Sequence, residues 1–140
     1  MNCRTLPLFL ATVAASAAPA TLYVSPAGRD VWPGTLPAPN ANRTDGPFQT
    51  VHRAQQAARA AKREQRERPV EVVLREGAYN LSEPLVLTPA DSGTAAGPVT
   101  WRSAENESVT LRAARAVSGW KRWKGDIRVA DLAEQGLEDA

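Results

Sequence analysis

Residues 70–81 read VEVVLREGAYNL, and this stretch indicates the fold more directly than any other part of the sequence. Residues 70–74 form an apolar run rich in β-branched side chains, which is typical of a buried strand. Gly77 marks a turn, and residues 79–81 predict a second short strand directly after it. Two short strands joined by a glycine turn predict a mainly β chain.

Other short β-rich runs flank this stretch. Residues 21–25 predict a strand that ends at Pro26-Ala27-Gly28, and a long loop rich in Pro, Gly and Asn follows over residues 29–47. Downstream, the strands we expect are spaced about 10 to 14 residues apart, which is compatible with a sandwich, a barrel or a solenoid. No strict repeat is visible at this length. These later runs are residues 85–87, 99–102, 109–112 and 127–129, with one helical turn at 131–136.

A single long helix is predicted from residue 51 to about residue 67. Thr50 is placed to cap its first turn, and Arg68-Pro69 stops it. A narrow, mostly alanine stripe at helical spacing predicts close packing on one side. The opposite side is predicted to be a solvated basic face. The stripe is Val51, Ala54, Ala57, Ala58 and Ala61, and the basic face is Arg53, Arg59, Lys62, Arg63 and Arg66.

Residues 1–20 have the pattern of a secretory signal peptide. Arg4 precedes an apolar run at residues 6–15, and small residues follow it, with cleavage expected after Ala17 or Ala20. The apolar run is shorter than the roughly 20 residues that a membrane-spanning helix needs. Residues 21–140 would then form the mature protein, secreted or periplasmic and outside the membrane. The single cysteine, Cys3, lies in the segment that is removed.

The charge of the chain argues against a nucleic-acid partner. The formal net charge is +2, with mixed signs along the sequence, and removal of Arg4 leaves +1. Nucleic-acid binding normally requires a clustered positive field that displaces counterions. The composition, 43% hydrophobic and 23% charged, is that of a globular protein.

The residues from which catalytic or metal-binding sites are usually built do not form a site in this sequence. No two carboxylates lie in a recognisable catalytic motif, and we assign no catalytic, cofactor or metal residue. Asp91, beside Ser92-Gly93, is expected to stabilise a turn, and Asp30 is similar. His52, the only histidine, is expected at the surface of the helix end.

The tryptophans offer the best candidates for contact with sugars, because their flat apolar faces can stack on sugar rings. Trp101 lies in a predicted strand and is expected in the core, and Trp32 is expected to anchor the long loop. Trp120 and Trp123 lie in an irregular region, so they are the possible carbohydrate-stacking residues. Packing against the protein remains the favoured interpretation for both, because tryptophan is usually well buried.

Five segments, in order, resemble the N-terminal part of right-handed parallel β-helix proteins of the pectate-lyase-like group. The set is most similar to β-helix glycoside hydrolases of the fucosidase and xylanase type. It covers most of residues 22–132, with a longer loop at residues 36–46 than that family pattern has. The segments are LYVSPAGRD at 22–30 with PGT at 33–35, PFQTV at 47–51, VLREGAY at 73–79, DSGT at 91–94 with GPVTW at 97–101, and VSGW at 117–120.

This resemblance implies a cap helix and the first coils of a truncated solenoid. A solenoid end needs a polar-faced cap, and about three stacked units are needed to bury a core. The isolated chain is therefore predicted to be marginally stable and to be a fragment of a longer protein. The resemblance implies carbohydrate hydrolysis by carboxylates beyond residue 140, with a polysaccharide or glycan as partner. A non-catalytic polysaccharide-binding or adhesin-type module, or a polysaccharide lyase, remains an alternative.

Overall fold

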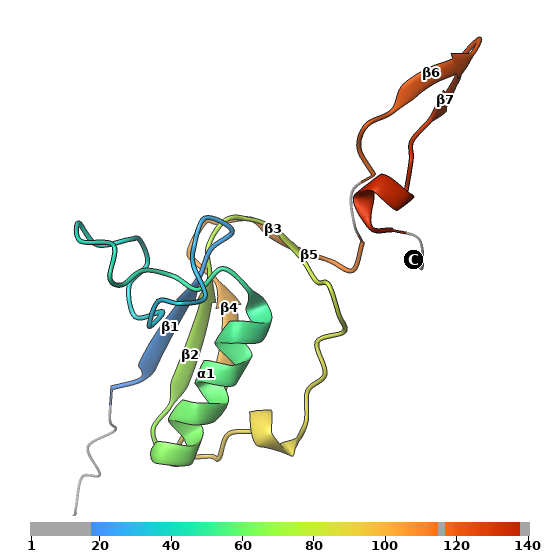
Figure 1. The fold of residues 1–140 in the computed structure, drawn as a ribbon. Coiled ribbons are helices and arrows are strands. Elements are labelled where there is room, and N and C mark those ends of the chain that lie inside the picture. The colour runs from blue at the N-terminus through green and yellow to red at the C-terminus, as the bar shows by residue number, and fades with distance from the viewer. Residues whose placement is uncertain (1–17, 115–116, 138–140) are drawn as a thin grey trace, which may run out of the picture.

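The computed structural model describes residues 18–114 and 117–137, and residues 1–17 of the predicted signal peptide lie outside this range. The main sheet contains three parallel strands in the order β1 (Ala20–Val24), β2 (Val70–Leu74) and β4 (Val99–Ser103) (Figure 1). The strands are aligned without stagger, so that Ala20 pairs with Val70 and Val70 pairs with Val99. Equivalent positions of the three strands therefore stack directly.

A second, smaller parallel sheet follows the first at a short turn. Strand β3 (Gly77–Asn80) comes after β2, strand β5 (Val109–Arg112) comes after β4, and the two pair with each other. The mainly β prediction is thus confirmed, with one long helix and small sheets. The parallel sheets of the described residues are short, so a solenoid of many coils is not seen in them.

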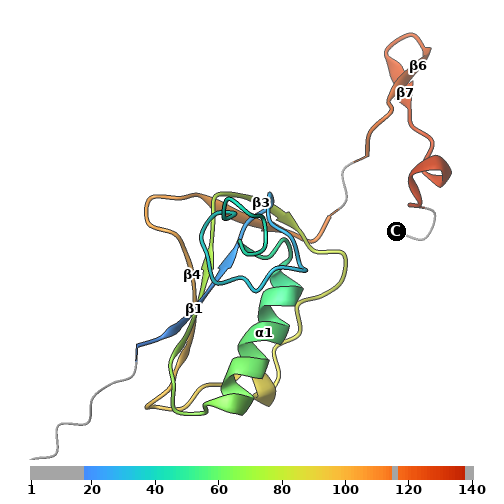
Figure 2. The same cartoon turned by 60° about the vertical axis from the view of Figure 1, so that its left-hand side comes forward.

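Helix α1 (Val51–Glu64) covers one face of the main sheet (Figure 2). Thr50 caps the helix as predicted, since its hydroxyl accepts a hydrogen bond from the Arg53 amide at 3.1 Å. The helix ends at Glu64 and not near residue 67 as predicted. The chain must reverse within residues 65–69 because the Val70 amide already donates to the Pro98 carbonyl in the sheet.

The core lies between the helix and the main sheet. Val24, Val72 and Ala54 are fully buried, and the predicted alanine stripe is the surface that contacts the strands. Small side chains let the helix backbone lie close to the sheet. The buried cluster consists of Leu22, Val24, Phe48, Val51, Ala54, Ala58, Val70, Val72, Leu74 and Tyr79.

The long loop after β1 is held by its aromatic residues. Trp32 is buried, and its indole N–H donates to the Arg43 carbonyl at 3.0 Å, which confirms its predicted anchoring role. Phe48 is buried in the core, and Gly34 lies directly against its ring with a φ of +77°. A side chain at position 34 would overlap that ring and strain the backbone, so glycine is required there.

Two predicted features of the middle and C-terminal regions are wrong. Residues 85–87 form no strand, because the Val86 carbonyl accepts from the Gln55 side chain of α1 at 2.8 Å and the segment runs alongside the helix. The region around Trp123, predicted to be irregular, contains strand β6 (Lys121–Lys124). This strand pairs antiparallel with β7 (Ile127–Val129), which lies where a strand was predicted.

Two short 3₁₀ helices complete the described fold. They are η1 (Pro89–Asp91) and η2 (Ala133–Gln135), the second within the helical turn predicted at residues 131–136. Figure 1 shows that the β6–β7 hairpin projects away from the sheets and α1, with η2 beside it. Within the described ranges, no helix combines the length and the apolar character required to cross a bilayer.

Candidate functional site

Several basic side chains of α1 contact other parts of the protein, so this side of the helix is only partly solvated. The Arg53 guanidinium lies over the Phe48 ring and donates to the Asp30 carbonyl at 3.1 Å. The Lys62 ammonium is buried and donates to backbone carbonyls. The prediction of a solvated face is therefore wrong for Arg53, Lys62 and also Arg59, because each binds a loop that is distant in the sequence.

Asp91 has the turn-forming role predicted for it and also an ionic partner that the sequence did not reveal. Its carboxylate accepts from the Thr88 amide at 2.7 Å and closes a capping box at the start of η1. Both carboxylate oxygens accept from the Arg59 guanidinium at 2.7 Å. Because these bonds favour the charged form, the pKa of Asp91 lies well below its usual range. Such a group holds no proton at neutral pH and cannot act there as a general acid.

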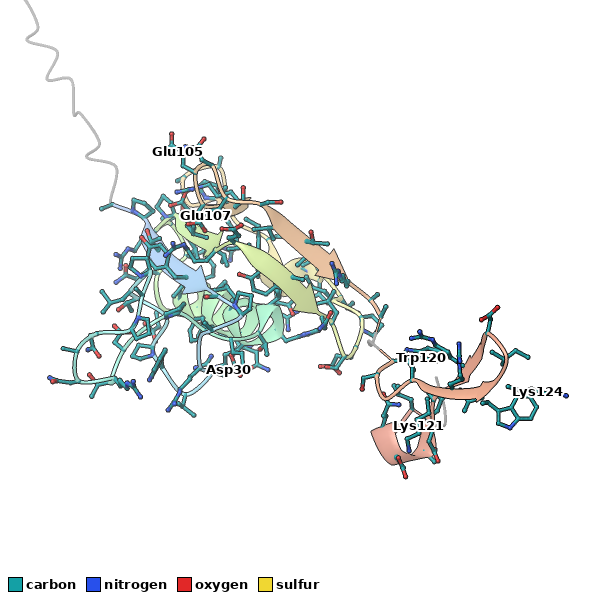
Figure 3. All side chains as sticks on the ribbon, turned by 90° about the horizontal axis from the view of Figure 1, so that it is seen from above. Asp30, Glu105, Glu107, Trp120, Lys121 and Lys124 are labelled. Carbon is teal, nitrogen blue, oxygen red and sulfur yellow. The ribbon has the colours of Figure 1, made fainter. Side chains whose placement is uncertain are left out.

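Glu107 is bound in the same way in the turn between β4 and β5. The Arg75 guanidinium donates to it at 2.8 Å, the Glu76 amide donates at 2.7 Å, and the pKa of Glu107 is lowered by these bonds. Figure 3 shows Glu107 near Glu105 on this turn, far from Asp30. Asp30 accepts from the Gln49 and Thr50 amides at 2.8 and 2.9 Å and so supports the start of α1. The carboxylates of Glu107 and Asp30 therefore have structural roles, one in a turn and one at the start of α1.

His52 and Tyr79 line a cavity of about 430 Å³ beside the start of α1. His52 is partly exposed, and its Nε2 atom lies 3.4 Å from the Pro84 carbonyl oxygen, which agrees with the predicted helix-end position. The buried Tyr79 hydroxyl lies 2.9 Å from the Val24 carbonyl oxygen and 2.7 Å from that of Arg75. Burial raises the pKa of Tyr79 to about 12. Tyr79 therefore closes the turn before β3 and keeps its proton.

The described residues contain no group of three or more His, Cys, Asp or Glu side chains arranged to hold a metal ion. A second cavity, of about 450 Å³, is mostly apolar and lies beside the edges of β4 and β5 that pair with no other described strand. Its walls include Leu74, Leu87, Trp101, Val109 and Leu111. Trp101 packs against the core as predicted, and it also forms part of this cavity wall.

Trp120 and Trp123 are the predicted stacking candidates. Trp123 lies in strand β6 of the β6–β7 hairpin, and Trp120 lies directly before that strand. Their exposed fractions are 54% and 68%, so the favoured prediction that they pack inside the protein is wrong for the described structure. The Trp120 indole N–H donates to the Val117 carbonyl at 3.0 Å, which fixes one edge of the ring. Trp123 lies in a β-bulge between Arg122 and Lys124. Both rings therefore leave surface open to a ligand.

Sequence reasoning missed strand β6 and the surface it creates. The run KRWKGDIRV at residues 121–129 has basic and apolar residues on both sides of a Gly-Asp turn, which is a hairpin signal. The antiparallel register then brings basic residues of the two strands together. We define the hairpin surface as Trp120, Lys121, Arg122, Trp123, Lys124 and Arg128, all of which are exposed.

Comparison with known proteins gives one informative likeness. Neither the protein-family models nor the curated proteins contain a match to this chain. A solved structure named "Glycoside hydrolase" is similar to it, with a TM-score of 0.67 and 31% sequence identity. The similarity covers 80% of this chain but only 18% of that protein. This chain therefore matches a small part of a much longer molecule.

Proposed function

We propose that this chain is the N-terminal part of an exported, carbohydrate-active protein, a glycoside hydrolase built as a right-handed parallel β-helix. The observation that carries the proposal is the likeness to a glycoside hydrolase, at 31% identity over 80% of this chain. An identity of that level together with a TM-score of 0.67 supports more than a shared arrangement of strands. Glycan is the partner that this function requires.

The packing of the two parallel sheets supports the β-helix part of the proposal. Strands β2 and β3 are followed, one level further, by β4 and β5 in the same direction. Among the described residues, no further strand pairs with the outer edges of β4 and β5, and residues of both strands line the apolar cavity of about 450 Å³. Parallel sheets normally have both faces and their edges covered. Further coils stacked on β4 and β5 would cover this cavity and complete the solenoid.

Hydrolysis of a glycosidic bond normally needs two carboxyl groups on either side of the bond. In the described residues, Asp30, Asp91 and Glu107 hold turns or the helix start by hydrogen bonds. We therefore place the catalytic carboxylates on coils beyond residue 140. On this proposal, the chain contributes the cap and the first coils and has no hydrolase activity alone.

The export part of the proposal rests on the signal-like pattern of residues 1–20. Strand β1 already includes Ala20, whose amide donates to the Pro69 carbonyl at 2.8 Å. Cleavage after Ala17 would leave this strand whole, whereas cleavage after Ala20 would remove its first residue. N-terminal sequencing of the exported protein should give Ala18 as the first residue. Retention of Met1 in the exported fraction would contradict the signal peptide.

A second candidate is a non-catalytic polysaccharide-binding module of the same architecture. The exposed rings of Trp120 and Trp123 favour this candidate, because no catalytic pair accompanies them in the described residues. The two candidates predict the same binding to glycans and differ in catalysis by the longer protein.

A glycan array and a hydrolysis assay test these proposals together. The purified chain and the product of the full reading frame that contains it are each applied to the array and incubated with the bound glycans. We expect both to bind a common set of glycans and only the longer protein to release reducing sugar. Binding without release by the longer protein would favour the binding module. Absence of glycan binding by both proteins would overturn the carbohydrate-active proposal.

A further inference from the structure

The β6–β7 hairpin concentrates positive charge that the rest of the chain does not have. Between Lys121 and Val129 there are four basic side chains and one carboxylate, Asp126, so this segment carries +3. The whole chain of 140 residues carries only +2. The hairpin is therefore a local positive region on a molecule that is otherwise close to neutral.

The register of the hairpin places two arginines directly opposite each other. Arg122 of β6 pairs with Arg128 of β7. Like charges in directly opposed positions of an antiparallel pair repel each other and destabilise the pair. The carboxylate of Asp126 lies 3.9 Å from Arg122, beyond hydrogen-bond distance, and both side chains are largely exposed. Among the described residues, no carboxylate is bonded to Arg128. An external anion is the group that would relieve this repulsion.

The aromatic side chains of the hairpin surface supply a second kind of contact. Trp123 lies between Arg122 and Lys124 at a bulge, a feature that redirects side chains and often occurs at binding sites. Figure 3 shows Trp120 and Lys121 toward the base of the hairpin and Lys124 further out. The basic and aromatic groups thus extend along the hairpin, as binding of a linear chain would require.

We infer that the β6–β7 hairpin binds an acidic polysaccharide, with Arg122 and Arg128 holding a sugar carboxylate and Trp123 stacking on a pyranose ring. This inference rests on the proposed carbohydrate-active function and adds the chemical class of the glycan. A guanidinium binds a carboxylate through two parallel hydrogen bonds, and an indole face suits the C–H groups of a sugar. A uronic acid residue carries both of these groups on one ring. An isolated two-stranded hairpin is marginally stable in water, so a bound chain would also order it.

The test is binding of the purified chain to polyglucuronate and alginate, measured by tryptophan fluorescence and isothermal titration calorimetry. The matched ligands are the same polymers after reduction of their carboxyl groups, which keeps the chain length and removes the charge. We expect binding to the acidic forms, weakened by about tenfold or more on reduction. Single-stranded DNA serves as a polyanion without uronic acid and should bind more weakly than the acidic polymers.

Arg122→Gln/Arg128→Gln is the test variant, and Arg63→Gln/Arg66→Gln is its control. The control removes the same charge from two exposed positions, one in the last turn of α1 and one just after the helix. We expect the test variant to lose about tenfold in affinity and the control to bind as the unmodified chain does. Trp123→Ala should also weaken binding and should abolish most of the fluorescence change. Circular dichroism shows whether each variant keeps the fold, and all of these positions are exposed.

Several results would overturn the inference. Equal binding of the acidic and reduced polymers would show that the protein does not recognise the sugar carboxylates. This result would not contradict the carbohydrate-active function. Equal loss of affinity in the test and control variants would show general charge attraction and not a site on the hairpin. Tighter binding to DNA than to either polyuronate would assign the surface to another class of ligand. Binding to neither the acidic nor the reduced polymers would also reject the inference, and the glycan array would then decide the proposed function separately.

Discussion

Lys62 illustrates, at the scale of a single residue, why a charge pattern along a helix gives an incomplete account of it. The sequence places Lys62 among basic residues on the outer side of α1. In the structure its ammonium is buried and donates to the carbonyls of Arg66, Arg68 and Gly97, the last two at 3.0 and 2.7 Å. These bonds join the end of the helix to the loop before β4. Helical periodicity contains no information about that loop, so this role could not be predicted.

Replacement of Lys62 tests this structural role. Lys62→Met keeps a similar side-chain length but leaves the three carbonyls without their donor. We expect the free energy of unfolding to fall by about 1–3 kcal/mol, the range for loss of a partner by buried polar groups. Arg63→Met, at the adjacent exposed position, should change it by no more than about 0.5 kcal/mol. Urea titration followed by circular dichroism measures both, and equal effects would contradict the role of Lys62.

Asp91 should make stability depend on pH in the acid range. Its pKa is lowered in the folded state, chiefly by the Arg59 side chain, and is about 4 in the unfolded chain. The resulting stability is present above about pH 4 and is lost as the pH falls further toward the folded-state value. Asp91→Asn should therefore destabilise the protein at about pH 7, and the difference from the unmodified chain should shrink at about pH 3.

Asp126→Asn is the matched control for this experiment. Asp126 is fully exposed and lies 3.9 Å from its nearest basic group, so we expect little change in stability at either pH. Urea unfolding midpoints of the three proteins provide the comparison. If the difference in stability between Asp91→Asn and the unmodified chain is the same at both pH values, the predicted link between protonation of Asp91 and stability is wrong.

At the scale of secondary-structure elements, strands with strong local patterns were predicted well. Residues 70–74 and 109–112 form strands with the predicted boundaries because their apolar runs are short and have clear ends. The run at residues 85–87 is also apolar, but it bonds to α1 and forms no strand, since strand pairing depends on partners far along the chain. Strand β6 was missed because its basic residues mask a hairpin pattern. Whether such a segment forms a strand depends on which strand it pairs with, and a local sequence pattern does not give that partner.

The start of α1 offers a prediction at this scale. Thr50 supplies the capping oxygen to the Arg53 amide, and its own hydroxyl donates to Asp30 at 2.8 Å. Thr50→Ala should lower the free energy of unfolding by about 1–2 kcal/mol, because a first-turn amide loses its acceptor. Thr50→Ser keeps the hydroxyl and should recover most of the loss. Thermal and urea unfolding measure this, and equal loss in the two variants would assign the effect to the methyl group instead.

At the scale of the whole molecule, the candidate site could be predicted only in part. Trp120 and Trp123 were selected from the sequence because tryptophan in an irregular region is available for stacking. Their exposure and the facing pair Arg122 and Arg128 follow from the hairpin register, which is known only from the structure. The apolar cavity beside β4 and β5 was not predicted, and the residues that line it became known only from the structure.

That open cavity predicts how the purified chain behaves in solution. Residues 18–140 should bind the dye ANS and unfold in a broad, low-temperature transition, because apolar groups at the edge of β4 and β5 remain uncovered. Leu111→Ser should reduce dye binding, since Leu111 is a 49% exposed part of the cavity wall. Ile127→Ser, at an exposed position on the hairpin, is the control. A sharp transition at high temperature from a monomer without dye binding would contradict this prediction.

The unstaggered alignment of β1, β2 and β4 has a consequence for the evolution of chain length. The strands begin level with one another at residues 20, 70 and 99, although the connections between them differ greatly in length. Insertions and deletions in these connections therefore need not shift the strand alignment. Loops between the strand ends can be gained or lost while the alignment of the strands is kept. Differences in length among relatives should therefore accumulate at the strand ends.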